Sequence, residues 1–248
     1  MSEIDIPMLP QMADWQHLNW QPNAEQQLQF QRLYELIIKA NQTLNLTRIT
    51  EPLDFWEKHL WDSLRGIMPL LEARGERLEV RGERLEARGE GREEELVQHS
   101  AFKIVDIGSG AGFPGIPTAI ARPDSQVTLL DSTRKKIAFL DSLIAELGIG
   151  NVNTVTGRAE VVGKESQHRQ AYDIALIRAV GSASICAEYA LPFLKSGGLA
   201  VLYRGNWTTE EAETLQNTVK RLGGAIEKVE EFTTPLSNSI RHCVYIRK

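Results

Sequence analysis

The glycine-rich stretch VDIGSGAGFPGIP, residues 105–117, is the part of the sequence best suited to binding a ligand. Gly110, Gly112 and Gly115 match the G-x-G-x-x-G pattern of dinucleotide-binding loops. An acidic residue, Asp131, follows about twenty positions later, where such folds place a group that binds ribose hydroxyls. On these features alone, a nicotinamide- or flavin-dependent oxidoreductase is one hypothesis.

Asp106 argues against a ligand that carries a pyrophosphate. It precedes the glycine loop at the end of an apolar run, where a dinucleotide would set its phosphates against the following helix. A carboxylate there would repel phosphate and attract an ammonium or sulfonium group. S-adenosylmethionine (SAM) has both groups, a ribose for Asp131 and no phosphate, so we expect SAM as the cofactor. A P-loop is excluded because no Gly-Lys-Ser/Thr follows the glycines.

Two further segments supply candidate cofactor contacts after later predicted strands. GRAE (157–160) follows the third strand, where the adenine should lie. Its Glu160 could face the adenine amino group or cap a helix. Arg178 ends the fourth strand, beside the expected methyl group, and a charged residue that ends a buried strand rarely lacks a partner.

The elements that must position these residues alternate between strands and helices. Apolar runs predict strands at 102–107, 126–131, 151–156, 172–178 and 198–205. Helical patterns follow Gly115 and cover 135–147, 159–162, a segment ending near Lys195, and 210–222. Two final strands, 225–234 and 241–248, have no helix between them and should be antiparallel. We predict an α/β fold with a doubly wound, seven-stranded, mostly parallel sheet and a ligand at the carboxyl ends of its strands.

Residues 1–70 are expected to form a small helical region before the SAM-binding domain at 101–248. Asn23 is a candidate N-cap, and a second helix should start near Pro52, with Pro69 closing the region. The apolar face of the first helix is predicted to hold Leu33, Leu36, Ile37, Ala40 and Leu44.

Residues 71–100 contain a repeat with a period of seven residues in three copies, LEARGER, LEVRGER and LEARGEG. The units lack the two apolar positions of a coiled-coil seam, and each carries a helix-weakening glycine. We expect a flexible insertion, because so few apolar residues cannot offset the entropy of ordering it.

Composition adds weaker expectations. The net charge of −5 is unusual for a general nucleic-acid binder, although a local basic patch remains possible. Cys186 and Cys243 have no metal-type spacing, no apolar run could span a bilayer, and no signal peptide is evident at residue 1. We expect a cytoplasmic, monomeric protein with reduced thiols and no bound metal.

Seven segments together resemble one family, the small-subunit ribosomal RNA guanine-N7 methyltransferases, also called glucose-inhibited division protein B. They are NLT (45–47), HLWDS (59–63), DIGSGAGFPGIP (106–117), LLDSTRKKIAFL (129–140), GRAE (157–160), RAV (178–180) and RH (241–242). The resemblance covers roughly residues 25–70 and 101–248. It implies a class I SAM-dependent methyltransferase that modifies N7 of a guanine in 16S rRNA. It also implies cofactor contacts at Gly108, Phe113, Ala159, Glu160 and Arg178.

Methylation at N7 would need no general base, because this atom is a lone-pair acceptor without a proton. Arg178 is therefore expected to orient a reactant rather than to transfer a proton. The RNA would meet basic residues near the cofactor, and the candidates are Arg134, Lys135, Lys136, Arg204, Arg241 and His242. His59 and Asp62, spaced for one helix face, could brace the N-terminal helices against the loop or contact RNA. A non-enzymatic SAM-binding module is a further alternative.

Overall fold

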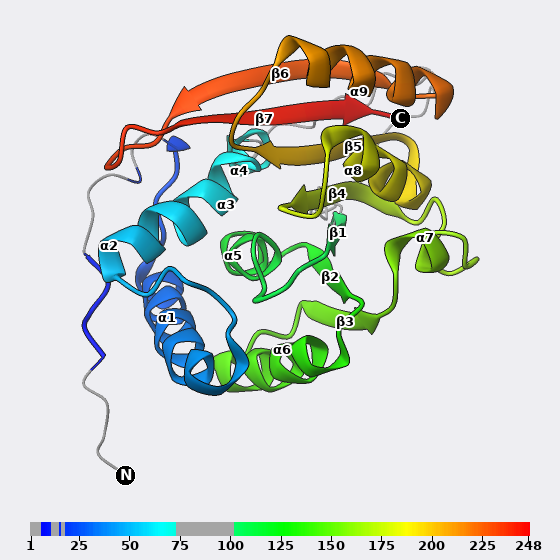
Figure 1. Cartoon of the computed structure of the whole chain (residues 1–248). Coiled ribbons are helices and arrows are strands. Elements are labelled where there is room, and N and C mark those ends of the chain that lie inside the picture. The colour runs from blue at the N-terminus through cyan, green and yellow to red at the C-terminus, as the bar shows by residue number, and fades with distance from the viewer. Residues whose placement is uncertain (1–5, 11–14, 16–17, 73–101) are drawn as a thin grey trace, which may run out of the picture.

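A seven-stranded sheet forms the centre of the computed structural model, which describes residues 6–10, 15, 18–72 and 102–248. Its order is β3-β2-β1-β4-β5-β7-β6 (Figure 1). Strands β1 to β5 run parallel, and β7 pairs antiparallel with both β5 and β6. The predicted doubly wound, mostly parallel sheet is confirmed. The strands are β1 (Lys103–Ile107), β2 (Gln126–Asp131), β3 (Val152–Thr156), β4 (Tyr172–Arg178), β5 (Leu194–Arg204), β6 (Ala225–Thr233) and β7 (Ile240–Arg247).

Helices cover both faces of this sheet (Figure 1). One face carries α1 (Ala24–Leu44), α2 (Pro52–Phe55), a π-helix (Trp56–Trp61), α3 (Asp62–Arg65), α4 (Met68–Glu72), α5 (Gly115–Ala121) and α6 (Arg134–Leu147). The other carries α7 (Ala159–Val162), α8 (Ala183–Ala190), a 3-10 turn (Leu191–Phe193) and α9 (Thr209–Arg221). None of the helices in the described part of the chain is long and apolar enough to cross a membrane.

Side chains alternate along each strand between two apolar cores, as the period of two in a strand requires. Ile104 of β1 belongs to the core under α1 and α5, whereas its neighbour Val105 belongs to the core under α8 and α9. By the same alternation, Asp106 points to the α5 face. Arg178 also points to this face, because Ile174 and Leu176 of β4 do.

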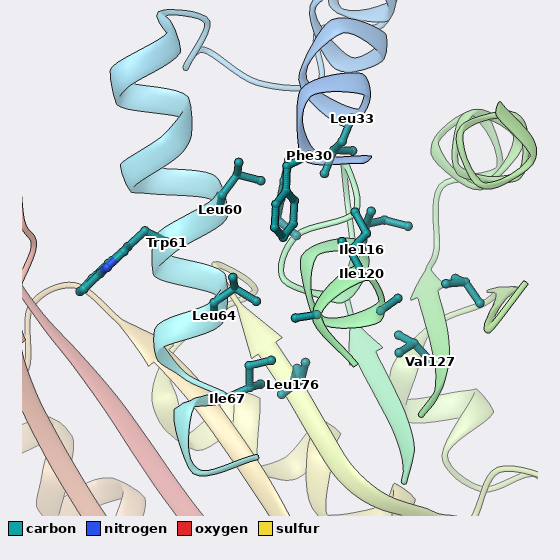
Figure 2. Packing of buried hydrophobic residues seen from close by; sticks show 14 of the residues in the cluster. Phe30, Leu33, Leu60, Trp61, Leu64, Ile67, Ile116, Ile120, Val127 and Leu176 are labelled. Atoms are coloured by element: carbon teal, nitrogen blue, oxygen red, sulfur yellow. The ribbon is translucent and has the colours of Figure 1, made fainter. Parts of the chain in front are cut away.

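The N-terminal helices share the first core with the sheet (Figure 2). Phe30 of α1, Leu60 of the π-helix and Leu64 of α3 lie beside Ile116 and Ile120 of α5. All five are at most 2% exposed, and each contributes about 1.5–3 kcal/mol by leaving water. The N-terminal helices are therefore held firmly against the element that follows the glycine loop.

The predicted start of α1 is confirmed by a capping box. Asn23 Oδ1 accepts the Gln26 N–H at 2.9 Å, and Gln26 Oε1 accepts the Asn23 N–H at 3.0 Å. Pro52 begins α2, as expected. The predicted apolar face is too long, because Leu44 ends the helix at 38% exposure. Pro69 does not close the region, since it lies in the first turn of α4, where proline needs no N–H partner.

Two other predicted boundaries change. The helix expected to end near Lys195 stops at Ala190, because a 3-10 turn with Pro192 as its second residue follows and β5 begins at Leu194. Of the predicted insertion, Leu71 and Glu72 belong to α4, and residues 73–100 lie outside the described residues.

Candidate functional site

The carboxyl ends of the parallel strands surround a hollow of about 150 Å³. It is lined by residues 107–108, 130–132 and 157–160, together with Val180 and Tyr189. A larger hollow, about 370 Å³, lies at the opposite edge, between α1 and the loops before β2 and β3. We assign the ligand to the smaller one, because open α/β sheets bind ligands at the carboxyl ends of their strands.

The glycine loop needs glycine at two positions in particular. Gly108 has φ +74°, and a Cβ there would lie 2.6 Å from Val180 Cγ2. Gly112 has φ +98°, and its Cβ would lie 2.8 Å from Ile116 Cγ1. Side chains are disfavoured at both positions by conformation and by space. Gly108 lines the hollow, so the backbone itself forms the wall there, whereas Gly112 faces the core.

Asp106 lies beneath this loop rather than at its surface. Its side chain is fully buried, and Oδ2 accepts the Gly115 N–H at 2.9 Å. Oδ1 is buried and has no hydrogen-bond partner among the residues that the structure describes. Burial raises the pKa of Asp106 to about 7, against the opposing effects of the Gly115 N–H and Arg178. The carboxylate predicted to attract a cationic ligand is therefore covered by the loop, and the contact between Asp106 and SAM stays a prediction.

The hydrogen bond to Gly115 weakens the dinucleotide hypothesis. Pyrophosphate binds to the free N–H groups at the start of the helix after the loop. In this chain Gly115 is the first residue of α5, and its N–H is donated to Asp106. The N–H group that a dinucleotide phosphate would need is thus already bonded to a carboxylate inside the protein.

Asp131 is held at the end of β2 by two backbone donors. Oδ2 accepts from Gly110 at 3.0 Å, and Oδ1 accepts from Thr133 at 2.8 Å. Each oxygen keeps a lone pair, and the residue lines the hollow. Its geometry is compatible with the predicted contact to ribose hydroxyls.

Ala159 and Glu160 line the far side of the hollow, at the start of α7. Glu160 makes no capping hydrogen bond, since the N-cap is Arg158 and no side chain caps this helix. Its carboxylate instead pairs with Arg158 at 3.6 Å. The sequence analysis missed Tyr189, which reaches the hollow from α8. The signal for it was the position of α8, directly after the strand that ends in Arg178.

Arg178 has three acceptors on the N-terminal segment. Nη1 donates to Lys58 O and to Asp62 Oδ2, both at 3.0 Å, and Nη2 lies 3.5 Å from His59 Nδ1. The guanidinium also lies 5.7 Å from the centre of the Phe113 ring. Of the two roles considered for His59 and Asp62, the structure favours holding the N-terminal helices against the sheet, because both side chains contact Arg178 at the end of β4.

The basic residues proposed for RNA divide into two groups. Arg134 and Lys135 are exposed and Lys136 is half-buried in the first turn of α6, with no ion pair among the described residues. Arg241 is half-buried at the start of β7.

Arg204 and His242, by contrast, already have partners inside the protein. Arg204 pairs with Glu211 and donates to Gly181 O at 2.7 Å. His242 is 7% exposed, and its ring nitrogens lie 3.0 Å from Gly205 O and 3.3 Å from Glu231 Oε2. The prediction that these two bind phosphate is therefore not supported, because each would first have to leave its partner.

The chain is similar to known proteins over nearly its whole length. The family described as "rRNA small subunit methyltransferase G" matches residues 26–87 and 91–243, which includes much of the repeat. A relative named "Ribosomal RNA small subunit methyltransferase G" from Nostoc punctiforme is 58% identical, over 97% of this chain and 91% of that protein. Relatives of the same name are 54% identical in Trichormus variabilis (97% and 91%) and in Trichodesmium erythraeum (100% and 90%).

Proposed function

The chain belongs to the rRNA small subunit methyltransferase G family, and from this premise we propose that it transfers a methyl group from SAM to N7 of a guanine in small-subunit (16S) ribosomal RNA. The observation that carries the proposal is the reach of the family match, which includes every residue of the candidate site. Neither the oxidoreductase nor the non-enzymatic module gains support from these similarities.

The residues at the hollow fit SAM. Asp131, which lines the hollow, suits the ribose hydroxyls. Asp106 lies behind the glycine loop and is not one of the lining residues, and its Oδ1, a buried acceptor without a partner among the described residues, is proposed to accept the ammonium group. Ala159, Glu160 and Tyr189 are the proposed contacts for the adenine, and Gly108 allows close approach of the backbone. When bound, SAM supplies a methyl group activated by its sulfonium.

The chain's own task is then alignment. Guanine N7 offers a lone pair and carries no proton, so no residue has to act as a base. Holding two reactants in line can remove several kcal/mol from a barrier, on the order of 7–11 kcal/mol in favourable cases. Arg178, fixed by the N-terminal segment, is proposed to orient the cofactor or the guanine O6.

The RNA is proposed to approach across the first turn of α6. Arg134, Lys135 and Lys136 follow Asp131 directly and have no internal ion pair among the described residues. Cations at a helix N-terminus oppose the helix dipole, which favours a role outside the fold. Arg241 would extend the contact along the same edge of the sheet. Either free RNA or an assembling small subunit could present the guanine.

The test is methyl transfer from labelled SAM to small-subunit particles and to their naked RNA, both from cells lacking the modification. We expect label in one of these substrates, mapped to a single guanine and lost after depurination chemistry specific for N7-methylguanine. A variant with a change on the exposed face of α6, Asp141→Asn, should retain activity. Absence of label from both substrates would overturn the proposal, and label on another atom would overturn the assignment to N7.

A further inference from the structure

His59 contacts two of the residues that the sequence predicts to bind the cofactor, Phe113 and Arg178. Its ring stacks on Phe113 of the glycine loop, with centroids 4.3 Å apart and planes 6° apart. Its Nδ1 lies 3.5 Å from Arg178 Nη2 at the end of β4. The residue is only 8% exposed, so it is part of the packing beneath the site and does not reach the surface where RNA would bind.

The neighbours of the ring determine where its proton lies. A guanidinium offers donors only, so Nδ1 can bond to Arg178 only as an acceptor. The proton must then be on Nε2, which lies 2.8 Å from Thr47 Oγ1 and can donate to it. Thr47 is itself fixed, because its Oγ1 accepts the Ile49 N–H at 3.0 Å and its N–H donates to Asn41 Oδ1 at 2.9 Å.

The ring is also held neutral. Burial, and secondarily the positive charge of Arg178, lower the pKa of His59 to about 3. The three charged side chains nearest to it on the same helical segment do not offset this, because each already has a partner. Asp62 accepts from Arg178, Lys58 pairs with Asp54 at 2.7 Å, and Glu57 accepts the Ser237 N–H at 2.8 Å. A protonated ring would set two cations against each other and would lose the acceptor that Arg178 uses.

We propose that His59 is a positioning residue, whose Nε2–H tautomer, fixed by Thr47, holds Arg178 and Phe113 in place for the cofactor. This inference rests on the proposed SAM site and adds the N-terminal segment to it. Three acceptors on one helical segment, Lys58 O, Asp62 Oδ2 and His59 Nδ1, then fix one guanidinium. In this arrangement His59 keeps its Nε2 proton and transfers no proton in the reaction.

The first measurement is ¹⁵N NMR of the histidine rings in the wild-type protein. We expect His59 as the neutral Nε2–H tautomer throughout pH 5.5–8, and a mixture of tautomers in Thr47→Val. His168, half-buried before β4 at the opposite edge of the sheet, is the internal comparison, and His168→Asn identifies its signal. An Nδ1–H tautomer, or a His59 that titrates near its ordinary pKa, would overturn the inference without any assay of methylation.

The second measurement is the affinity for S-adenosylhomocysteine in three variants. His59→Asn keeps an acceptor near the place of Nδ1, His59→Gln keeps a donor toward Thr47, and His59→Phe keeps only the stacking. Since a hydrogen bond contributes about 0.5–1.5 kcal/mol, we expect affinity within about threefold of wild type for Asn and about tenfold weaker for Phe. The KM for SAM should rise in His59→Phe more than kcat falls, whereas a purely structural role would affect thermal stability alone.

The outcomes separate this inference from the proposed function. Unchanged affinity in His59→Phe would overturn the role of His59 and leave the methyltransferase proposal intact. A second outcome is that the variants show the affinity differences above, while the wild-type protein binds S-adenosylhomocysteine but methylates no ribosomal RNA. This outcome would overturn the proposed substrate alone. If His59→Phe does not fold, Thr47→Val and the NMR measurement on wild-type protein still decide the question.

Discussion

Replacing Asp106 with Asn should remove a pH dependence of cofactor binding that the structure predicts for the wild-type protein. Asp106 is fully buried, and its pKa is raised to about 7. A ligand ammonium needs the ionised carboxylate at Oδ1. Below pH 7 the free protein holds a proton on this group, so binding must release it.

The size of the effect follows from the fraction of protein with an ionised Asp106. About half is competent at pH 7 and about one part in a hundred at pH 5, so the apparent affinity should fall about fiftyfold between these values. The ligand's own ammonium stays protonated over this range. Asp106→Asn should show no such slope. At pH 7 it should bind more weakly than wild type, because a hydrogen bond to a charged group contributes about 1.5–3 kcal/mol.

The assay is calorimetric titration with S-adenosylhomocysteine at pH 5, 6 and 7, in two buffers that differ in ionisation enthalpy. The buffer dependence counts the protons released on binding, and about one is expected at pH 5 for wild type and none for Asp106→Asn. Asp141→Asn, which alters an exposed carboxylate on α6, is the matched control and should behave as wild type. A wild-type affinity that stays flat from pH 5 to 7 would refute the reasoning, as would the same slope in both proteins.

Three further predictions concern charge. The double variant Lys135→Ala, Lys136→Ala should release about one or two fewer ions on binding RNA, as measured from the slope of affinity against salt concentration. Its affinity for S-adenosylhomocysteine should be unchanged. Arg204→Gln should lower the free energy of unfolding by about 1–3 kcal/mol in urea, because the part-buried carboxylate of Glu211 then keeps the Ala183 N–H but no cation, and should leave the salt dependence of RNA binding unaltered. His59 should make the protein less stable in acid: its folded pKa of about 3 lies below the unfolded value, so its contribution is complete above pH 6.5 and is lost as the pH falls. Relative to His59→Gln, the wild-type protein should lose about 2 kcal/mol between pH 6.5 and pH 5 in denaturant titrations.

The sequence allows the sheet to be predicted almost strand for strand, because buried parallel strands appear as short apolar runs between helical patterns. The wrong predictions lie where a local feature of the helix ends competes with the apolar pattern. Leu44 has the correct spacing for the core, but it ends α1 beside a left-handed Asn45 and faces solvent. Pro69 was predicted to end a region, although the first turn of a helix accepts proline without loss.

The candidate site was harder to predict than the fold. Residue types identified Asp106, Asp131 and Arg178, and strand ends placed them at one edge of the sheet. Pairing could not be predicted, because it depends on which surface each side chain meets after packing. Arg204 looked like an exposed cation, but Glu211 of α9 reaches it across the sheet edge. Tyr189 escaped notice because a tyrosine in a helix is ordinarily core or surface, and only the tertiary arrangement brings it to the hollow.

The π-helix at Trp56–Trp61 makes this part of the chain sensitive to its length as well as to its composition. The Asp62 N–H donates to Glu57 O, five residues back, so this segment holds one residue more than an α-helix would. Removing that extra residue would let the segment close into an α-helix, so the residues that follow would keep their positions. Inserting a further residue would instead turn everything that follows by about 100°. Asp62 would then leave Arg178, and Leu64 would leave the core, while most of the composition stayed the same. A one-residue insertion should therefore be tolerated less well here than most substitutions, and less well than a one-residue deletion.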